Sequence, residues 1–333
     1  MTVVTGFLGS GKTTLIRRLL THPGMNRVAV VINEFGEVGI DNALVAASSE
    51  SITLLANGCL CCTVRTDLQE TLRELFTQRR TGAVIDFDRV VVETTGLADP
   101  APVIQTFAAD TLLAAQYRLD GVVTLVDAVN GARQLDAQPE AVKQAAVADR
   151  LLLTKTDLAG AVEVEALRAR LRSLNPRAEF AAAVQGEIEP AFFLDIGLRT
   201  ARADGAQLER WLGSPGEGDG YLGKRLATGA HDRAIRSFVL WFDRPFSWQT
   251  FSAAMELLTS MRGPDLLRVK GLVNVAGERG PVVVQGVQHI FHPPTTLDAW
   301  PSEDRRSRLV FITRNIPQEA VAALFAAVGG LGE

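Results

Sequence analysis

The chain of 333 residues has little cysteine, no excess of positive charge and no long apolar run. Its three cysteines are too few for a disulfide framework. Their clustering at positions 59–62 is typical of a metal or redox site in a reducing compartment. The net charge of −4 indicates no nucleic acid partner. We also expect no bilayer span and no secretory signal, because no basic N-terminal segment precedes an apolar core. These features favour a cytosolic protein.

What is present is an ordinary globular balance, with 47% hydrophobic and 22% charged residues. Apolar, strand-like runs alternate with amphipathic stretches in the first half of the chain. Strands are predicted at residues 27–32, 89–92, 121–126 and 150–153, and helices at 13–20, 67–79 and 161–174. Nearly continuous apolar strands between helices predict an α/β fold with a doubly wound, mostly parallel sheet.

The pattern changes after residue 199. Residues 200–234 contain the Gly-rich stretch Gly213–Gly220 and are predicted to be a linker or mobile loop. Residues 235–330 are predicted to form a smaller α+β domain. Its expected strands are 235–242, 267–275, 281–287 and 308–313, and its expected helices are 248–259 and 317–327. Trp241, Phe242, Trp248 and Phe251 are assigned to its core.

A phosphate-binding loop is the first motif that carries chemistry. The stretch from Gly6 to Thr13 fits G-x-x-x-x-G-K-[ST], with a strand before it and a helix after it. Backbone N–H groups of such a loop surround phosphate oxygens, and the helix N-terminus adds partial positive charge. Lys12 is expected to reach the β- and γ-phosphates, and the Thr13 hydroxyl to bind Mg²⁺. The predicted nucleotide-binding residues here are Gly6, Gly9, Ser10, Gly11, Lys12, Thr13 and Thr14.

An acidic residue should end a neighbouring strand. Glu93 follows three valines and is predicted to orient the attacking water or to hold Mg²⁺, and Gly96 is predicted to lie against the γ-phosphate. Asp127 also ends a strand, but it is more simply interpreted as a turn or capping acid.

A base-recognition motif follows the strand at 150–153. Lys155 and Asp157 form Lys-x-Asp, in which a carboxylate can accept both polar hydrogens of guanine. Adenine cannot supply that pair of donors. Thr154 stands where many GTPases have Asn, and it joins Lys155 and Asp157 in the predicted base site.

The cysteines lie in Asn57-Gly-Cys-Leu-Cys-Cys-Thr-Val-Arg65. Thiolates suit soft ions such as Zn²⁺, and three thiolates with one carboxylate would complete a tetrahedral site. The adjacent Cys61 and Cys62 can share one ion only through a tight local turn, so two thiolates with two other ligands is an alternative. Buried structural thiols and a redox pair remain further alternatives.

Taken together, these motifs resemble the CobW-like metal-handling GTPases. The matching stretches begin at Gly6, Asn33, Gly58, Glu93 and Thr154, in the family's order and spacing. The C-terminal part also resembles that family's second domain, through residues 268–271 and 309–312.

The resemblance implies that residues 33–41 form the first switch loop. Glu34, Glu37 and Asp41 are then candidates for metal contacts, with Glu37 as the fourth ligand beside Cys59, Cys61 and Cys62, and Asp41 near Mg²⁺ with Thr13 and Glu93. Some relatives carry a further Glu before the Asn, where this chain has Ile32, and the histidine-rich metal store of many relatives is absent.

The resemblance therefore implies GTP hydrolysis coupled to delivery of a transition metal to a client metalloprotein, with zinc as the leading candidate for that metal. The expected cofactors are GTP, Mg²⁺ and Zn²⁺, or Co²⁺ or Ni²⁺ in place of zinc. No nucleic acid or membrane partner is expected, and the protein should be a monomer or homodimer. The alternatives are cobalt supply for cobalamin synthesis, nickel or iron supply to another metalloenzyme, and a non-catalytic metal or redox sensor that binds GTP structurally.

Overall fold

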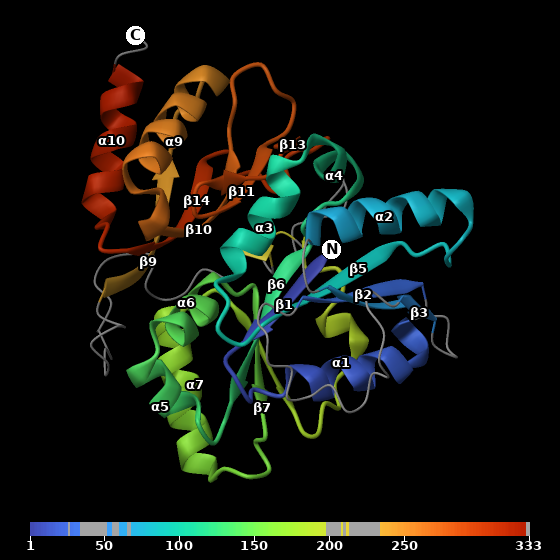
Figure 1. Cartoon of the computed structure of the whole chain (residues 1–333). Helices are drawn as coiled ribbons and strands as arrows, with labels where there is room; N and C mark the ends of the chain where they lie inside the picture. Colours follow the sequence, from blue (N-terminus) through green and yellow to red (C-terminus); the bar gives the residue numbers. More distant parts are fainter. Residues whose placement is uncertain are drawn as a thin grey trace. The chain divides into compact units, whose positions relative to one another are not determined.

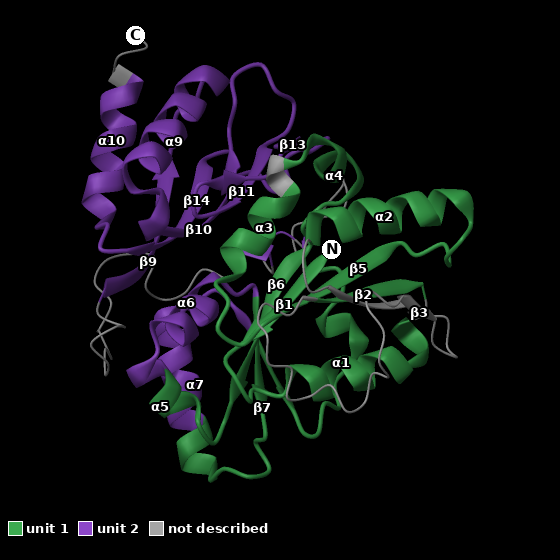
Figure 2. Cartoon of the chain, viewed as in Figure 1, with its two compact units in different colours: residues 1–134, 150–164, 180–196 green, residues 135–149, 165–179, 197–333 purple. Residues whose placement is uncertain are grey.

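A computed structural model describes residues 1–25, 27–33, 52–54, 60–64, 68–197, 208, 211–212 and 234–330, and for strands β3 and β4 it describes the backbone alone. The chain forms two compact units (Figure 2). Unit 1 contains residues 1–134, 150–164 and 180–196, and unit 2 contains 135–149, 165–179 and 197–333.

Unit 1 is built on a sheet with the strand order β3-β4-β2-β5-β1-β6-β7-β8. The strands from β4 to β7 in this order run parallel, whereas β3 pairs antiparallel with β4. The strands are β1 Thr2–Gly6, β2 Val28–Asn33, β3 Ile52–Leu54, β4 Leu60–Val64, β5 Arg89–Thr94, β6 Gly121–Asp127, β7 Arg150–Thr154 and β8 Glu179–Ala183. The predicted mostly parallel sheet is confirmed.

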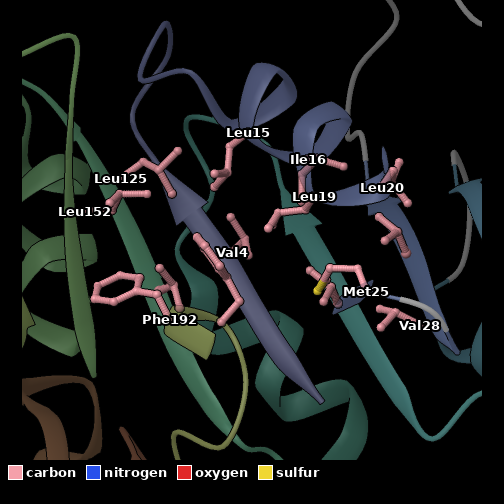
Figure 3. Close-up of a cluster of buried hydrophobic side chains, with 14 of the residues drawn as sticks. Val4, Leu15, Ile16, Leu19, Leu20, Met25, Val28, Leu125, Leu152 and Phe192 are labelled. Carbon is pink, nitrogen blue, oxygen red and sulfur yellow. The ribbon is translucent and has the colours of Figure 1, made fainter. Parts of the chain in front are cut away.

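Helices cover both faces of this sheet (Figure 1). Helix α1, Lys12–Thr21, packs its buried residues Leu15, Ile16 and Leu19 on Val4 and Val91, as Figure 3 shows in part. Helices α2 Leu68–Thr81 and α3 Pro100–Ala109 lie on the opposite face, followed by α4 Thr111–Gln116. Burial on both faces explains why the strands read as continuous apolar runs.

The later helices of the first half are α5 Gly131–Ala137, α6 Pro139–Val147 and α7 Ala161–Leu174. Helix α6 and most of α7 belong to unit 2. None of the helices in the described ranges is both long and apolar enough to cross a bilayer.

Unit 2 contains an antiparallel sheet with the order β12-β11-β10-β14-β9, and β13 also pairs with β11. Its strands are β9 Ile235–Phe242, β10 Leu266–Val273, β11 Val282–Val287, β12 Ile290–Phe291, β13 Thr295–Thr296 and β14 Ser307–Arg314. Helices α9 Trp248–Arg262 and α10 Gln318–Gly330 bury Phe251 and Phe325 against Phe311 of β14. The predicted α+β architecture is confirmed.

The assignment of both tryptophans to this core is wrong. Phe251 is buried, but Trp241 and Trp248 are 36% and 40% exposed. Trp241 lies on the edge strand β9, where the guanidinium groups of Arg306 and Arg308 lie 4.6 and 5.3 Å from its ring centroid. Trp248 is the first residue of α9, at the helix end.

Candidate nucleotide site

The phosphate-loop motif joins β1 to α1, as predicted. Gly9 and Gly11 have φ of 74° and 90°, a left-handed backbone in which glycine avoids the penalty of a Cβ. The buried Lys12 donates from Nζ to the carbonyl oxygens of Gly6, at 2.8 Å, and Phe7, at 3.4 Å. Burial holds the pKa of Lys12 below its ordinary value, although the negative charge of Glu93 acts in the opposite direction. The loop thus places a buried ammonium beside backbone groups that can surround phosphate.

Glu93 meets this loop at the carboxyl end of β5. Its side chain is buried, and Oε1 accepts a hydrogen bond from Thr13 Oγ1 at 3.4 Å. Gly96 lies against the loop as well, because a Cβ at this residue would stand 2.7 Å from the backbone nitrogen of Leu8. The structure therefore brings Lys12, Thr13, Glu93 and Gly96 together around one loop.

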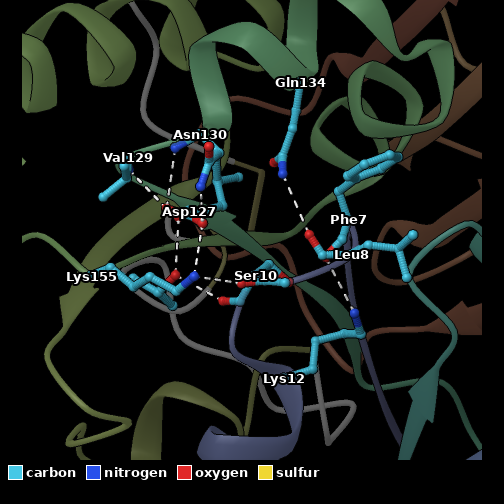
Figure 4. Close-up of polar contacts among 12 residues, drawn as sticks. Phe7, Leu8, Ser10, Lys12, Asp127, Val129, Asn130, Gln134 and Lys155 are labelled. Atoms are coloured by element: carbon cyan, nitrogen blue, oxygen red, sulfur yellow. Dashed lines mark hydrogen bonds and ion pairs between the residues drawn. The ribbon is translucent and has the colours of Figure 1, made fainter. Parts of the chain in front are cut away.

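The end of β7 is attached to the other side of the same loop (Figure 4). Thr154 Oγ1 donates to the Ser10 carbonyl at 2.8 Å, and Lys155 Nζ donates to the Gly9 carbonyl at 2.7 Å. Lys155 has φ of 57°, a left-handed conformation that costs a non-glycine residue about 1–2 kcal/mol. The chain then turns, and Asp157 is exposed in that turn. This arrangement leaves the Asp157 carboxylate accessible to a base.

Asp127 completes the network at the carboxyl end of β6. Oδ1 accepts from the backbone N–H groups of Val129, at 2.8 Å, and Asn130, at 3.2 Å, which confirms the interpretation as a turn acid. Oδ2 accepts from Asn130 Nδ2 at 3.0 Å and from Lys155 Nζ at 2.8 Å. Burial raises the pKa of Asp127, but the hydrogen bonds from Asn130 and Lys155 outweigh it and hold that pKa below its ordinary value.

The ion pair between Asp127 and Lys155 was not predicted from the sequence. A signal was present, because both residues follow adjacent apolar strands, and parallel strands bring their carboxyl ends to one edge. The register sets Asp127 opposite Thr154. A weaker contact, from Gln134 Nε2 to the Leu8 carbonyl at 3.4 Å, had no sequence signal.

The predicted metal residues are described only in part. Cys61 and Cys62 lie in β4, opposite Val30 and Val31 of β2, and their backbone is extended without a tight local turn. Cys59, Glu34, Glu37 and Asp41 lie outside the described residues, as does most of the predicted linker at 200–234. Within the described ranges, three or more His, Cys, Asp or Glu residues do not gather as a metal site would require.

Comparisons with known proteins cover both halves of the chain. The family model of the CobW/HypB/UreG nucleotide-binding domain matches residues 1–182, and that of the cobalamin synthesis protein cobW C-terminal domain matches residues 235–329. The zinc chaperone YjiA of Escherichia coli is 38% identical over 98% of this chain and 97% of its own length. The zinc chaperone CobW of Pseudomonas aeruginosa is 32% identical over 97% of this chain and 89% of its own.

A solved structure agrees with these sequence matches. The crystal structure of the Zn(II)-bound YjiA GTPase from E. coli superposes with a TM-score of 0.73 at 35% identity, and it covers 98% of both chains. The likeness therefore extends over the phosphate loop, the turn at residues 155–157, where base recognition is predicted, and the C-terminal sheet.

Proposed function

The chain belongs to the CobW/HypB/UreG family of nucleotide-binding proteins, with the CobW C-terminal domain, and on this basis we propose that it is a GTPase that acts as a zinc chaperone. We assign residues 1–199 to the nucleotide-binding domain and 235–330 to the C-terminal domain. The protein would act in the cytoplasm, as a monomer or homodimer, and would deliver zinc to a client apoprotein.

Guanine recognition rests on one observation above the others. Asp157 lies in the turn that follows β7, and Thr154 and Lys155 attach the start of this turn to the phosphate loop by hydrogen bonds. The base and the phosphates would therefore contact one continuous surface. Asp157 would accept the two polar hydrogens of guanine, and the Lys155 stem would lie along the base. Adenine would leave the carboxylate without those donors, which is the strongest kind of discrimination that a polar site offers.

Hydrolysis would use the residues on the other side of the loop. Lys12 would bind the β- and γ-phosphates, Glu93 would orient the attacking water, and Gly96 would approach the γ-phosphate through its backbone. The hydroxyl of Thr13 and the carboxylate of Glu93 meet at 3.4 Å, and such hard oxygen donors suit Mg²⁺. When bound there, Mg²⁺ would neutralise charge on the phosphates.

Zinc, as the cargo, would be held by Cys59, Cys61, Cys62 and Glu37 if β4 turns locally on binding, and by two of the thiolates with two other ligands if β4 stays extended. Thiolates must lose their protons before they bind, so zinc affinity should fall with falling pH. Glu37 belongs to the loop that the family resemblance identifies as a nucleotide-responsive switch. Nucleotide and zinc should therefore alter each other's affinity by the same factor.

The test is a competition titration with a chromogenic zinc chelator, with and without a non-hydrolysable GTP analogue. We expect the analogue to change zinc affinity by several-fold, as coupling free energies of about 1–3 kcal/mol give. Cys61→Ser and Cys62→Ser, made separately, should show which thiolates bind zinc, and both variants should still bind GTP.

Lys12→Ala is the matched control. It should bind zinc normally but lose the response to the analogue, because it cannot hold the phosphates. Equal zinc affinity in the wild-type protein with and without the analogue would contradict the coupling and, with it, delivery driven by GTP.

A further inference from the structure

Asp127 has a buried carboxylate with its hydrogen-bonding capacity filled from two directions. A carboxylate offers about four acceptor sites, and Asp127 uses Oδ1 for the turn at Val129 and Asn130 and Oδ2 for Asn130 and Lys155. A turn acid needs only the first oxygen. The ion pair with Lys155 is therefore an addition to the turn.

Lys155 in turn bridges two elements. Its ammonium lies between Asp127 and the carbonyl of Gly9, and its backbone holds a left-handed conformation at the start of the turn to Asp157. Removal of the carboxylate would leave the ammonium with the Gly9 carbonyl as its remaining contact among those described here. The position of the base-recognition turn relative to the phosphate loop would then be less defined.

We propose that Asp127 is a positioning residue for the nucleotide, which fixes the spacing between the base-recognition turn and the phosphate loop through Lys155. The proposal rests on the proposed function, since it concerns how the same site binds GTP. The residue touches neither base nor phosphate. Its contribution is to keep the base-recognition turn and the phosphate loop at the distance that separates the base of a nucleotide from its phosphates.

The parallel contact of Thr154 supports this role. Its hydroxyl holds the carbonyl of Ser10, and the N–H of Gly11 shares a planar trans peptide with that carbonyl and points the opposite way. Attachment of β7 to the loop thus also orients a loop donor. Two neighbouring residues of one strand end, Thr154 and Lys155, hold two consecutive carbonyls of the loop, and only the longer side chain requires a counter-charge.

This geometry predicts an effect on whole nucleotides that is larger than the effect on fragments. A ligand that spans both halves gains from their fixed spacing, whereas a ligand that fills one half does not. The isosteric Asp127→Asn can keep the turn through its amide oxygen. The amide nitrogen of the new asparagine would face the Lys155 ammonium, and since both groups are donors, the hydrogen bond between these residues is lost.

The experiment measures binding of GTP, GDP and inorganic tripolyphosphate by isothermal titration calorimetry, together with steady-state hydrolysis. For Asp127→Asn we expect about tenfold weaker binding of GTP and GDP, as loss of a charged hydrogen bond gives, and nearly unchanged tripolyphosphate binding. KM for GTP should rise with kcat almost unchanged. Lys155→Met removes the same ion pair, and the double variant should lose less than the sum of the two single losses.

Asp110→Asn is the matched control. Asp110 is also a buried capping acid, but it lies at the start of α4. It accepts from the backbone N–H groups of Leu112 and Leu113 and from the side chain of Gln69, and it pairs with Arg73. The Asp110→Asn substitution should reduce thermal stability without any change in GTP binding. If Asp127→Asn does not fold, the tripolyphosphate comparison is made with Lys155→Met.

Unchanged GTP affinity, or equal losses for GTP and tripolyphosphate, would overturn the positioning role of Asp127. Equal wild-type affinity for ATP and GTP would instead overturn the proposed guanine recognition. The comparison of whole nucleotide with tripolyphosphate would still decide the role of Asp127.

Discussion

Among single residues, Glu93 combines burial with contacts to the groups that would meet the γ-phosphate. The residue is 5% exposed, its carboxylate accepts a hydrogen bond from Thr13, and its negative charge acts to raise the pKa of Lys12. A buried anion is costly unless cations and donors compensate it. Here the compensating groups are those that we propose to bind phosphate and Mg²⁺, which supports the proposed role of Glu93 in orienting the attacking water.

Glu93→Gln should therefore separate binding from chemistry. The amide keeps the shape and can still accept from Thr13, but it cannot take a proton. We expect GTP affinity close to wild type and kcat lower by about 10²-fold, the usual contribution of a general base. Phosphate release under single-turnover conditions measures this. Glu187→Gln, a change at an exposed carboxylate, should leave the rate unaltered, and an unaltered rate in Glu93→Gln would remove Glu93 from the mechanism.

At the scale of elements, the ends of the parallel strands show what hydrophobic pattern can and cannot predict. Strands β2, β5, β6 and β7 were all predicted, and each continues beyond its last predicted residue into polar ones. The final residues are Asn33, Thr94, Asp127 and Thr154. An apolar criterion stops at the core boundary, but the backbone ladder with a parallel neighbour continues past it. The ends of β5, β6 and β7 carry Glu93, Asp127 and Thr154 of the candidate site.

Helix α6 was not predicted, because it is only 9 residues long. Its polar residues Glu140, Lys143 and Gln144 lie on one face, but the amphipathic pattern has no room to repeat. Contacts such as Lys155 with Asp127 depend on which strands are neighbours. The motifs singled out Lys12, Glu93 and Thr154, but the pairing of Lys155 with Asp127 is visible only in the strand order.

Gly6, in the turn between β1 and α1, leads to a prediction about the stability of the fold. Gly6 has φ of 144°, and a Cβ there would collide with the backbone carbonyl of Leu125 in β6, which cannot move aside as a side chain could. We expect Gly6→Ala to destabilise the protein by more than about 3 kcal/mol, as strain against fixed backbone does.

Gly82→Ala is the matched control for that change. Gly82 also has a left-handed φ, of 73°, but open space around its Cβ position, so only the conformational penalty of about 1–2 kcal/mol applies. Urea unfolding followed by circular dichroism compares the two variants. Equal shifts of the midpoint would show that the Leu125 carbonyl is not the obstacle.

At the scale of the whole molecule, the chain passes repeatedly between its two units, and unit 2 combines segments from both halves of the sequence. The boundary expected at residue 199 divides the chain by composition, whereas compactness groups 135–149 and 165–179 with the C-terminal sheet. A buried charge cluster lies inside unit 2. Asp149 accepts two hydrogen bonds of 2.9 Å from Arg268 and pairs with Lys270, which also donates to the Trp211 carbonyl.

Asp149→Ala should unfold unit 2 more easily. Loss of the carboxylate leaves the buried Arg268 and the partly buried Lys270 without that charge partner, and breaking a buried pair in this way costs about 3–5 kcal/mol. Differential scanning calorimetry should show a lower transition temperature. Asp304→Ala removes the exposed pair with Arg306 and should cost no more than about 1 kcal/mol. Similar shifts in both variants would contradict the role of burial.

The same cluster sets an order of events on the ribosome. Asp149 and Arg268 are separated by 119 positions, which take roughly 6–24 s to translate at ordinary speeds of about 5–20 residues per second. During that interval the nascent chain carries a carboxylate at the end of α6 whose cations have not yet been synthesised. The strands β1, β5, β6 and β7, by contrast, have all been made. The nucleotide-binding sheet can therefore form first, and GTP in the cell can stabilise it before β10 has been synthesised and unit 2 can fold.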